Sequence, residues 1–135
     1  MPKEAITLYS YALSPYAAKV HLFLVFKGLA FETFYVDPRR VDAQLPLGRK
    51  VPVLTIGEQA RADSTPIGLW LEECFPEPPA LLPEDSASRE ALLAIDAWVS
   101  ERLIPGTFRV MLAARASWPA RIRNRRRGAR ALHAT

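Results

Sequence analysis

Residues 50–73, KVPVLTIGEQARADSTPIGLWLEE, carry the signals that decide the fold. Pro52 lies in an apolar, β-branched run at residues 51–56, and because proline cannot donate a hydrogen bond to a sheet, it belongs at the start of a strand. A tight turn then leads to a short strand at residues 59–62, which predicts an antiparallel hairpin. Residues 63–75 open with helix-capping side chains and a proline in the first turn, a pattern typical of a helix.

The residues before this stretch predict a strand, a helix and a second strand. Residues 5–10 and 30–37 are rich in β-branched and aromatic side chains, as strands are. Between them, the Ser-Pro pair at 14–15 is a typical helix start, and Gly28 is a natural helix stop. Residues 38–50 contain two prolines and a glycine and are predicted to be irregular. The order predicts an α/β domain with a mixed four-stranded sheet, its first pair of strands parallel and its last pair antiparallel.

The residues after the stretch predict a linker and then a helix. PEPPALLP, residues 76–83, holds four prolines, which neither a helix nor a central strand tolerates. Residues 84–103 carry an apolar stripe at helical spacing, with Ser86 or Ser88 as the N-cap. The sequence IPG at 104–106 is expected to interrupt this helix before it resumes.

Charge separates the body of the chain from its C-terminal part. Residues 1–108 carry 10 Lys and Arg against 14 Asp and Glu, whereas residues 109–135 carry eight arginines and no acidic residue. The segment RIRNRRRGAR (121–130) resembles a nucleic-acid-binding arm in charge alone, because aromatic residues are not interleaved with its arginines. We therefore expect a solvated, disordered basic tail and no nucleic-acid partner.

Several site and compartment classes are disfavoured. No apolar run is long enough to span a bilayer, and the N-terminus lacks the long apolar core of a signal peptide. Cys74 is the single cysteine and cannot form an internal disulfide. His21 has no second histidine or cysteine nearby, so no metal site is predicted. We expect a cytoplasmic protein without a membrane partner.

Three motifs, in this order and spacing, resemble the N-terminal, thioredoxin-like domain of glutathione S-transferases. They are SPYAAKVHLFLVFKGLAFE (14–32), KVPVL (50–54) and DSTPIGLWLEE (63–73). The resemblance covers residues 5 to about 75, and the linker and following helix extend it to about residue 108. It implies a thioredoxin-like βαβ-ββα domain.

The resemblance also implies a domain organisation. A glutathione-binding domain would occupy residues 1–75, a linker 76–83, the start of an all-α second domain 84–112, and a basic tail 113–135. Because the resemblance fades after Phe108, we expect that second domain to be truncated to a short helical remnant. In the family it supplies most of the pocket for the second substrate and half of the dimer contacts, and the resemblance allows a homodimer.

Glutathione is the co-substrate that the resemblance implies, and no metal is expected. Val51 and a cis Pro52 would align the cysteinyl part, Asp63 and Ser64 would hold the γ-glutamyl end, and Lys50 would assist the glycyl carboxylate. Each has a plainer interpretation: a strand start for Pro52, helix capping for Asp63 and Ser64, and a solvated charge for Lys50. Capping and binding are compatible, so both remain open.

Ser14 lies where serine-type members carry the catalytic serine. Lowering a thiol pKa by two units requires about 2.7 kcal/mol of preferential thiolate stabilisation. A hydrogen bond to the anion contributes about 1.5–3 kcal/mol and a helix N-terminus about 0.3–1 kcal/mol, which is sufficient. Ser14 is also a good N-cap, and Ser10 and Tyr9 are rivals for the catalytic role. Ser14 and Ala17 occupy the two cysteine positions of glutaredoxins, which disfavours redox exchange.

Two classes of function follow. The first is a glutathione transferase in which Ser14 stabilises the thiolate for conjugation to small electrophiles. The alternative is a non-catalytic binding or assembly module of the same fold, or an inactive truncated fragment. The set of Ser14, Pro52, Asp63 and Ser64 favours the enzyme.

Overall fold

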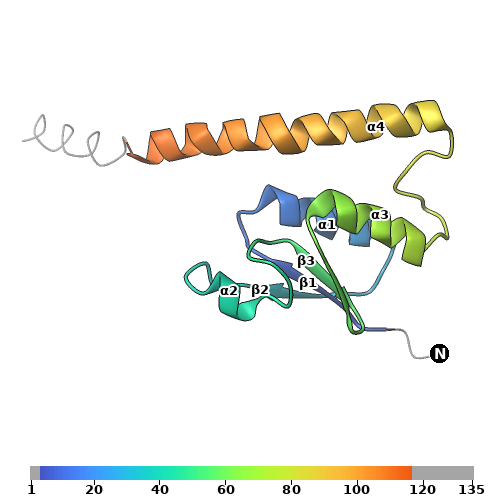
Figure 1. The fold of residues 1–135 in the computed structure, drawn as a ribbon, viewed down its shortest axis with the longest axis horizontal. Helices are drawn as coiled ribbons and strands as arrows, with labels where there is room; N and C mark the ends of the chain where they lie inside the picture. Colours follow the sequence, from blue (N-terminus) through green and yellow to red (C-terminus); the bar gives the residue numbers. More distant parts are fainter. Residues whose placement is uncertain (1–3, 117–135) are drawn as a thin grey trace, which may run out of the picture. The chain divides into compact units, whose positions relative to one another are not determined.

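Four strands form one mixed sheet in the order β2-β1-β3-β4 in the computed structural model, which describes residues 4–116 (Figure 1). The described residues group into two compact units, one ending at Asp96 and one beginning at Ala97. In chain order, the first unit contains β1 (Ile6–Ser10), α1 (Pro15–Phe26), β2 (Glu32–Tyr35), α2 (Val41–Gln44), β3 (Val53–Ile56), β4 (Gln59–Ala62) and α3 (Ser64–Cys74). It ends within α4 (Ser86–Trp98), whose last two residues belong to the second unit.

The sheet is mixed in the predicted way. β1 pairs in parallel with β2 through the α1 crossover, and β1 pairs antiparallel with β3. β3 and β4 form the predicted antiparallel hairpin, with Gly57 at a positive φ of 57° in its turn. The expected thioredoxin-like βαβ-ββα arrangement is therefore confirmed.

The core lies between the sheet and the pair of helices α1 and α3, which lie side by side over it in Figure 1. Alternate residues of β1 point into this core, as the period of a half-buried strand requires. Gly68 of α3 allows the close approach of the helices, because a Cβ atom there would lie 2.9 Å from the ring of Phe23. The largest fully buried side chains are Leu8, Val20, Leu24, Val53, Leu54, Ile67 and Leu71.

Three local expectations were wrong. The segment 38–50 is not wholly irregular, because it contains α2. Asp85, rather than Ser86 or Ser88, caps α4: its Oδ1 accepts from the backbone N–H of Ser88 at 2.8 Å. The same N–H holds the pKa of the Asp85 carboxyl below its usual value.

The helix is also not interrupted at IPG. A π-helical turn, Val99–Leu103, follows α4, and residues 104–116 are α-helical. In a regular α-helix the ring of Pro105 would collide with the carbonyl group of Glu101, and the wider π-turn lies at that point. The first four residues of the expected basic tail, 113–116, belong to this helical stretch, and the rest of the tail lies outside the described residues.

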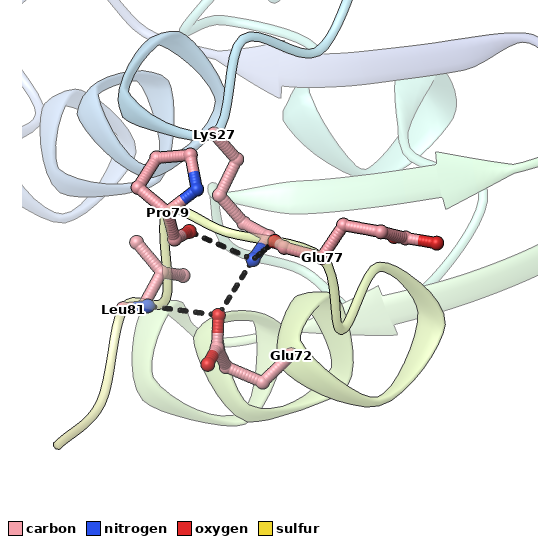
Figure 2. A network of polar contacts seen from close by, with 5 residues as sticks. All are labelled: Lys27, Glu72, Glu77, Pro79 and Leu81. Carbon is pink, nitrogen blue, oxygen red and sulfur yellow. Dashed lines mark hydrogen bonds and ion pairs between the residues drawn. The ribbon is translucent and has the colours of Figure 1, made fainter. Parts of the chain in front are cut away.

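The proline-rich segment 76–83, which was predicted to be a linker, is held by a polar cluster around the Lys27 side chain (Figure 2). The side chain of Lys27, at the C-terminal end of α1, is only 1% exposed, and its Nζ lies 2.8 Å from Glu72 Oε1. The same Nζ donates to the carbonyl groups of Glu77 and Pro79, at 3.5 and 3.1 Å. Glu72 Oε1 in turn accepts from the N–H of Leu81 at 2.9 Å. We call these five residues the linker clamp.

Candidate functional site

The strand register brings the separately predicted motifs to one end of the sheet. Tyr9 pairs with Val53, and Val53 pairs with Ala62, so the ends of three strands lie in a row. One residue further on, the N–H of Asp63 donates to the carbonyl group of Pro52 at 3.3 Å. The Val51–Pro52 and Asp63–Ser64 pairs therefore meet.

Two helices begin at this end. β1 and β4 run in the same direction, because each is antiparallel to β3, and α1 follows β1 as α3 follows β4. The N-terminus of a helix carries a partial positive charge and N–H groups without a partner within the helix. The end of the sheet is thus suited to anionic groups such as a carboxylate or a thiolate.

Ser14 is the N-cap of α1, as predicted. Its φ and ψ are −85° and 112°, and its Oγ accepts from the N–H of Ala17 at 3.2 Å. Its own N–H donates to the carbonyl group of Tyr11 at 2.9 Å. Because the cap uses a lone pair of the hydroxyl oxygen, the hydroxyl proton is not consumed by the cap. Capping therefore leaves the catalytic prediction for Ser14 intact.

Asp63 is in an uncommon backbone conformation. Its φ of 69° and ψ of 137° lie outside the regions that side-chain-bearing residues favour. Such conformations cost about 1–3 kcal/mol and concentrate at functional sites. Its side chain makes no capping hydrogen bond with α3, so the interpretation of this carboxylate as a helix cap is wrong. The neighbouring Ser64 is buried, 5% exposed, in the first turn of α3.

The segment before β3 presents its backbone and a free basic side chain. The Val51–Pro52 peptide bond is cis, as the resemblance implied, with Pro52 buried and Val51 half-buried. Arg49 is occupied elsewhere, since its Nη2 lies 2.7 Å from Asp42 Oδ2. That hydrogen bond lowers the pKa of Asp42. Lys50 is exposed, and it forms no such pair within residues 4–116.

The two rivals of Ser14 are engaged in the sheet. The ring of Tyr9 packs against that of Phe34, with centroids 5.3 Å apart, so it lies within the strand as expected. Ser10 is 8% exposed, and its carbonyl group accepts from the N–H of Val36 at 2.9 Å.

A further polar cluster beside the site was not foreseen. Lys19 Nζ donates to Thr65 Oγ1 at 3.0 Å, Thr65 Oγ1 donates to Asp96, and Lys19 and Asp96 form an ion pair. Thr65 follows Ser64 directly. The partners lie 46 and 31 positions from Thr65, on α1 and α4, so no local pattern in the sequence indicates them.

Metal ligands, membrane-spanning helices and the single cysteine were considered next. Within the described residues, no group of three or more His, Cys, Asp or Glu side chains is arranged to hold a metal ion. No helix in that part of the chain is long and apolar enough to cross a membrane. Cys74, the last residue of α3, is largely exposed. Partial desolvation of its thiol, followed by the nearby negative charge of Glu73, raises the pKa of that thiol.

Residues 8–79 match the family model of the glutathione S-transferase N-terminal domain. Among curated proteins, the chain is 41% identical over 92 residues to glutathione S-transferase 1 of Dianthus caryophyllus, covering 64% of this chain and 41% of that protein. It is 36% identical over 97 residues to glutathione S-transferase Z1 of Arabidopsis thaliana, covering 64% of this chain and 42% of that protein. The chain thus spans about two fifths of the length of these relatives.

Solved structures of similar proteins include ligand complexes. A glutathione transferase homologue from Burkholderia with bound glutathione has a TM-score of 0.69 and 32% identity, covering 76% of this chain and 57% of that one. A maleylacetoacetate isomerase from Anaeromyxobacter dehalogenans with glutathione in its active site has a TM-score of 0.66 and 35% identity, covering 78% and 53%.

Proposed function

Because the chain belongs to the glutathione S-transferase family, we propose that it binds glutathione and activates its thiol for attack on small electrophiles. The observation that carries the proposal is the convergence of Ser14, the Val51–Pro52 pair and the Asp63–Ser64 pair at one end of the sheet. The similarity to structures with bound glutathione supports this ligand.

The start of α3 suits the γ-glutamyl end. The N–H groups of Ser64 and Thr65 precede the first hydrogen bond within the helix, from Ile67 to Asp63. Together with the Ser64 hydroxyl they would donate to the γ-glutamyl carboxylate. The Asp63 carboxylate, which does not cap the helix, would accept from the ammonium group.

The segment before β3 suits the rest of the peptide. The N–H and carbonyl groups of Val51 would pair with the cysteinyl backbone as one strand pairs with another. Lys50 would pair with the glycyl carboxylate. Its neighbour Arg49 is a weaker candidate, because it already holds Asp42.

Ser14 would then stabilise the thiolate. Its hydroxyl would donate to the glutathione sulfur while its oxygen continues to accept from Ala17. A free thiol has a pKa of about 8.5, and a charge-assisted hydrogen bond of about 1.5–3 kcal/mol lowers this by about one to two units. The N-terminus of α1 adds to the effect, so a substantial thiolate fraction is expected at neutral pH.

Calorimetric titration with glutathione tests the binding. We expect binding by the wild-type chain, and a Ser64→Ala variant should bind about 10- to 100-fold more weakly, because it loses a hydrogen bond to a charged group. Glu58→Gln, a change at an exposed residue in the turn between β3 and β4, is the control and should bind glutathione as the wild type does. No detectable binding by the wild type at millimolar glutathione would overturn the proposal.

The ultraviolet absorbance of the bound thiolate tests the role of Ser14. In a Ser14→Ala variant we expect the pKa of the bound thiol to rise by one unit or more. An unchanged pKa in that variant would remove Ser14 from the mechanism and point to Ser10 or Tyr9. An unshifted pKa in the wild type would favour the non-catalytic binding module instead.

The solved isomerase structures support a second reaction class. The chain is 35% identical to one with glutathione in its active site, and glutathione-dependent isomerisation needs the same thiolate. An isomerase returns free glutathione after each turnover, whereas conjugation consumes it. Measuring the free thiol that remains during turnover of an unsaturated dicarboxylic substrate distinguishes the two reactions.

A further inference from the structure

The hydroxyl group of Thr65 forms hydrogen bonds with two charged partners. It accepts from Lys19 of α1 and donates to Asp96 of α4, and these two side chains also pair with each other. The cluster is partly shielded from water, with Lys19 and Asp96 side chains 18% and 23% exposed. Lys19 Nζ additionally lies 5.7 Å from the ring centre of Phe23, a cation–π contact. We call this closed set the Lys19–Thr65–Asp96 link.

The link bears directly on the first turn of α3. Thr65 is the second residue of this helix, and its backbone N–H is one of the two that the γ-glutamyl carboxylate would meet. A β-branched side chain in a helix has few rotamers, so fixing the Thr65 hydroxyl also fixes the backbone that carries it. The strained conformation of Asp63 one residue before Ser64 gives this turn a second constraint.

The link is also the main polar attachment of α4. This helix has no buried residue, and of its side chains only Leu93 and Asp96 are half-buried. Apolar burial, which holds most helices in place, therefore contributes little to its attachment. Asp96 supplies both the hydrogen bond to Thr65 and the ion pair to Lys19.

We propose that the Lys19–Thr65–Asp96 link positions the first turn of α3 for glutathione, so that attachment of α4 and glutathione binding reinforce each other. The inference rests on the proposed function, because it concerns the same γ-glutamyl subsite. Coupling of this kind is reciprocal: whatever α4 adds to glutathione affinity, glutathione adds to the attachment of α4. Thr65, Lys19 and Asp96 are positioning residues, and the thiol chemistry stays with Ser14.

The test uses the full chain and glutathione itself. Thr65→Val keeps the shape of the side chain and removes the hydroxyl, and we expect about tenfold weaker glutathione binding by calorimetry. Thr65→Ser restores the hydroxyl and should restore the affinity to within about twofold. The pKa of the bound thiol should stay at its wild-type value in both, since Ser14 is untouched. Asp96→Asn removes the charge that pairs with Lys19 and should also weaken glutathione binding. Glu90→Gln, which neutralises an exposed acid on the same helix, is its matched control.

Hydrogen exchange provides the reciprocal measurement. Glutathione should slow amide exchange in α4 of the wild type and of Glu90→Gln, but not in Asp96→Asn. If Thr65→Val does not fold, Asp96→Asn and Lys19→Met carry the binding test. Equal glutathione affinity in the wild type and in folded Thr65→Val or Asp96→Asn would overturn the coupling alone. Absence of glutathione binding in the wild type would overturn both the coupling and the proposed function.

Discussion

Asp63 shows, at the scale of one residue, how the site is set up before any ligand arrives. Its φ of 69° is unfavourable for a residue with a Cβ atom, and its carboxylate forms no capping hydrogen bond with α3 that would compensate for this cost. The conformation is held by its surroundings, including the hydrogen bond from its N–H to Pro52. This strained conformation allows the chain to turn from β4 directly into the N-terminus of α3.

A comparison of Asp63→Gly with Asp63→Ala measures this strain, because both variants lack the carboxylate. We expect Asp63→Gly to be more stable than Asp63→Ala by about 1 kcal/mol or more, since glycine adopts positive φ without a Cβ clash. Urea unfolding gives the two free energies. Equal stabilities would show that the backbone at Asp63 is not strained. Under the proposed function both variants should also lose glutathione affinity, because the carboxylate that would accept from the ammonium group is gone.

At the scale of elements, the site depends on how closely α1 and α3 pack. Their N-termini lie at one end of the sheet, and Gly68 of α3 lies against Phe23 of α1 further along the two helices. The link through Thr65 and the linker clamp at Lys27 tie the same two helices near their opposite ends. Polar contacts at both ends and close packing between them leave little freedom for one helix to slide along the other.

Gly68→Ala tests this packing. A methyl group there would lie 2.9 Å from the Phe23 ring, and overpacking of this kind costs about 1–3 kcal/mol. We therefore expect a net loss of stability on thermal unfolding, despite the better helix propensity of alanine. Gly106→Ala is the control, because a Cβ atom at Gly106 meets nothing within 4 Å, and it should be neutral or stabilising. Adding Phe23→Leu should recover part of the loss; no recovery would contradict the contact.

At the scale of the whole molecule, the linker clamp connects stability to pH. Burial alone would raise the pKa of Glu72, but hydrogen bonds from Lys27 and from the Leu81 N–H outweigh it, and the pKa lies below the usual 4.5. The unfolded chain therefore binds this proton more readily than the folded chain does. Stability from this group is present above pH 4.5 and is lost as the pH falls through the folded-state value.

Glu72→Gln should reveal this dependence. At neutral pH we expect a loss of about 3–5 kcal/mol, because the buried Lys27 is left without its counter-charge. Below pH 4.5 the difference between the wild type and the variant should shrink, since the wild-type carboxylate is then protonated as well. Denaturant unfolding across this pH range gives the difference. Parallel stability curves would show that Glu72 does not carry the acid sensitivity.

Much of the fold was predictable because its signals are local. Proline at the start of a strand, a glycine turn and a Ser-Pro helix start each act over a few residues, and β4 and the N-cap at Ser14 lie where they indicated. The π-turn before Pro105 was not predictable, because a proline normally ends a helix. The capping of α4 by Asp85 was missed because two serines nearby are equally good caps.

The candidate site was predictable only where the family motifs reach. The resemblance indicated Ser14, the cis Val51–Pro52 bond and the Asp63–Ser64 pair, and the strand register brings these together. The contacts of Lys19 and Asp96 with Thr65 join residues of three helices, which no short pattern encodes.

The position of Cys74 makes the chemistry of this protein convenient to observe. It is the only cysteine in the chain and ends α3, the helix that Ser64 begins. The pKa of its thiol is raised, whereas that of bound glutathione is expected to fall. At neutral pH the thiolate absorbance of a glutathione complex would therefore come from the ligand. The spectrum of the ligand-free wild-type chain can then be subtracted directly, without a variant that lacks Cys74.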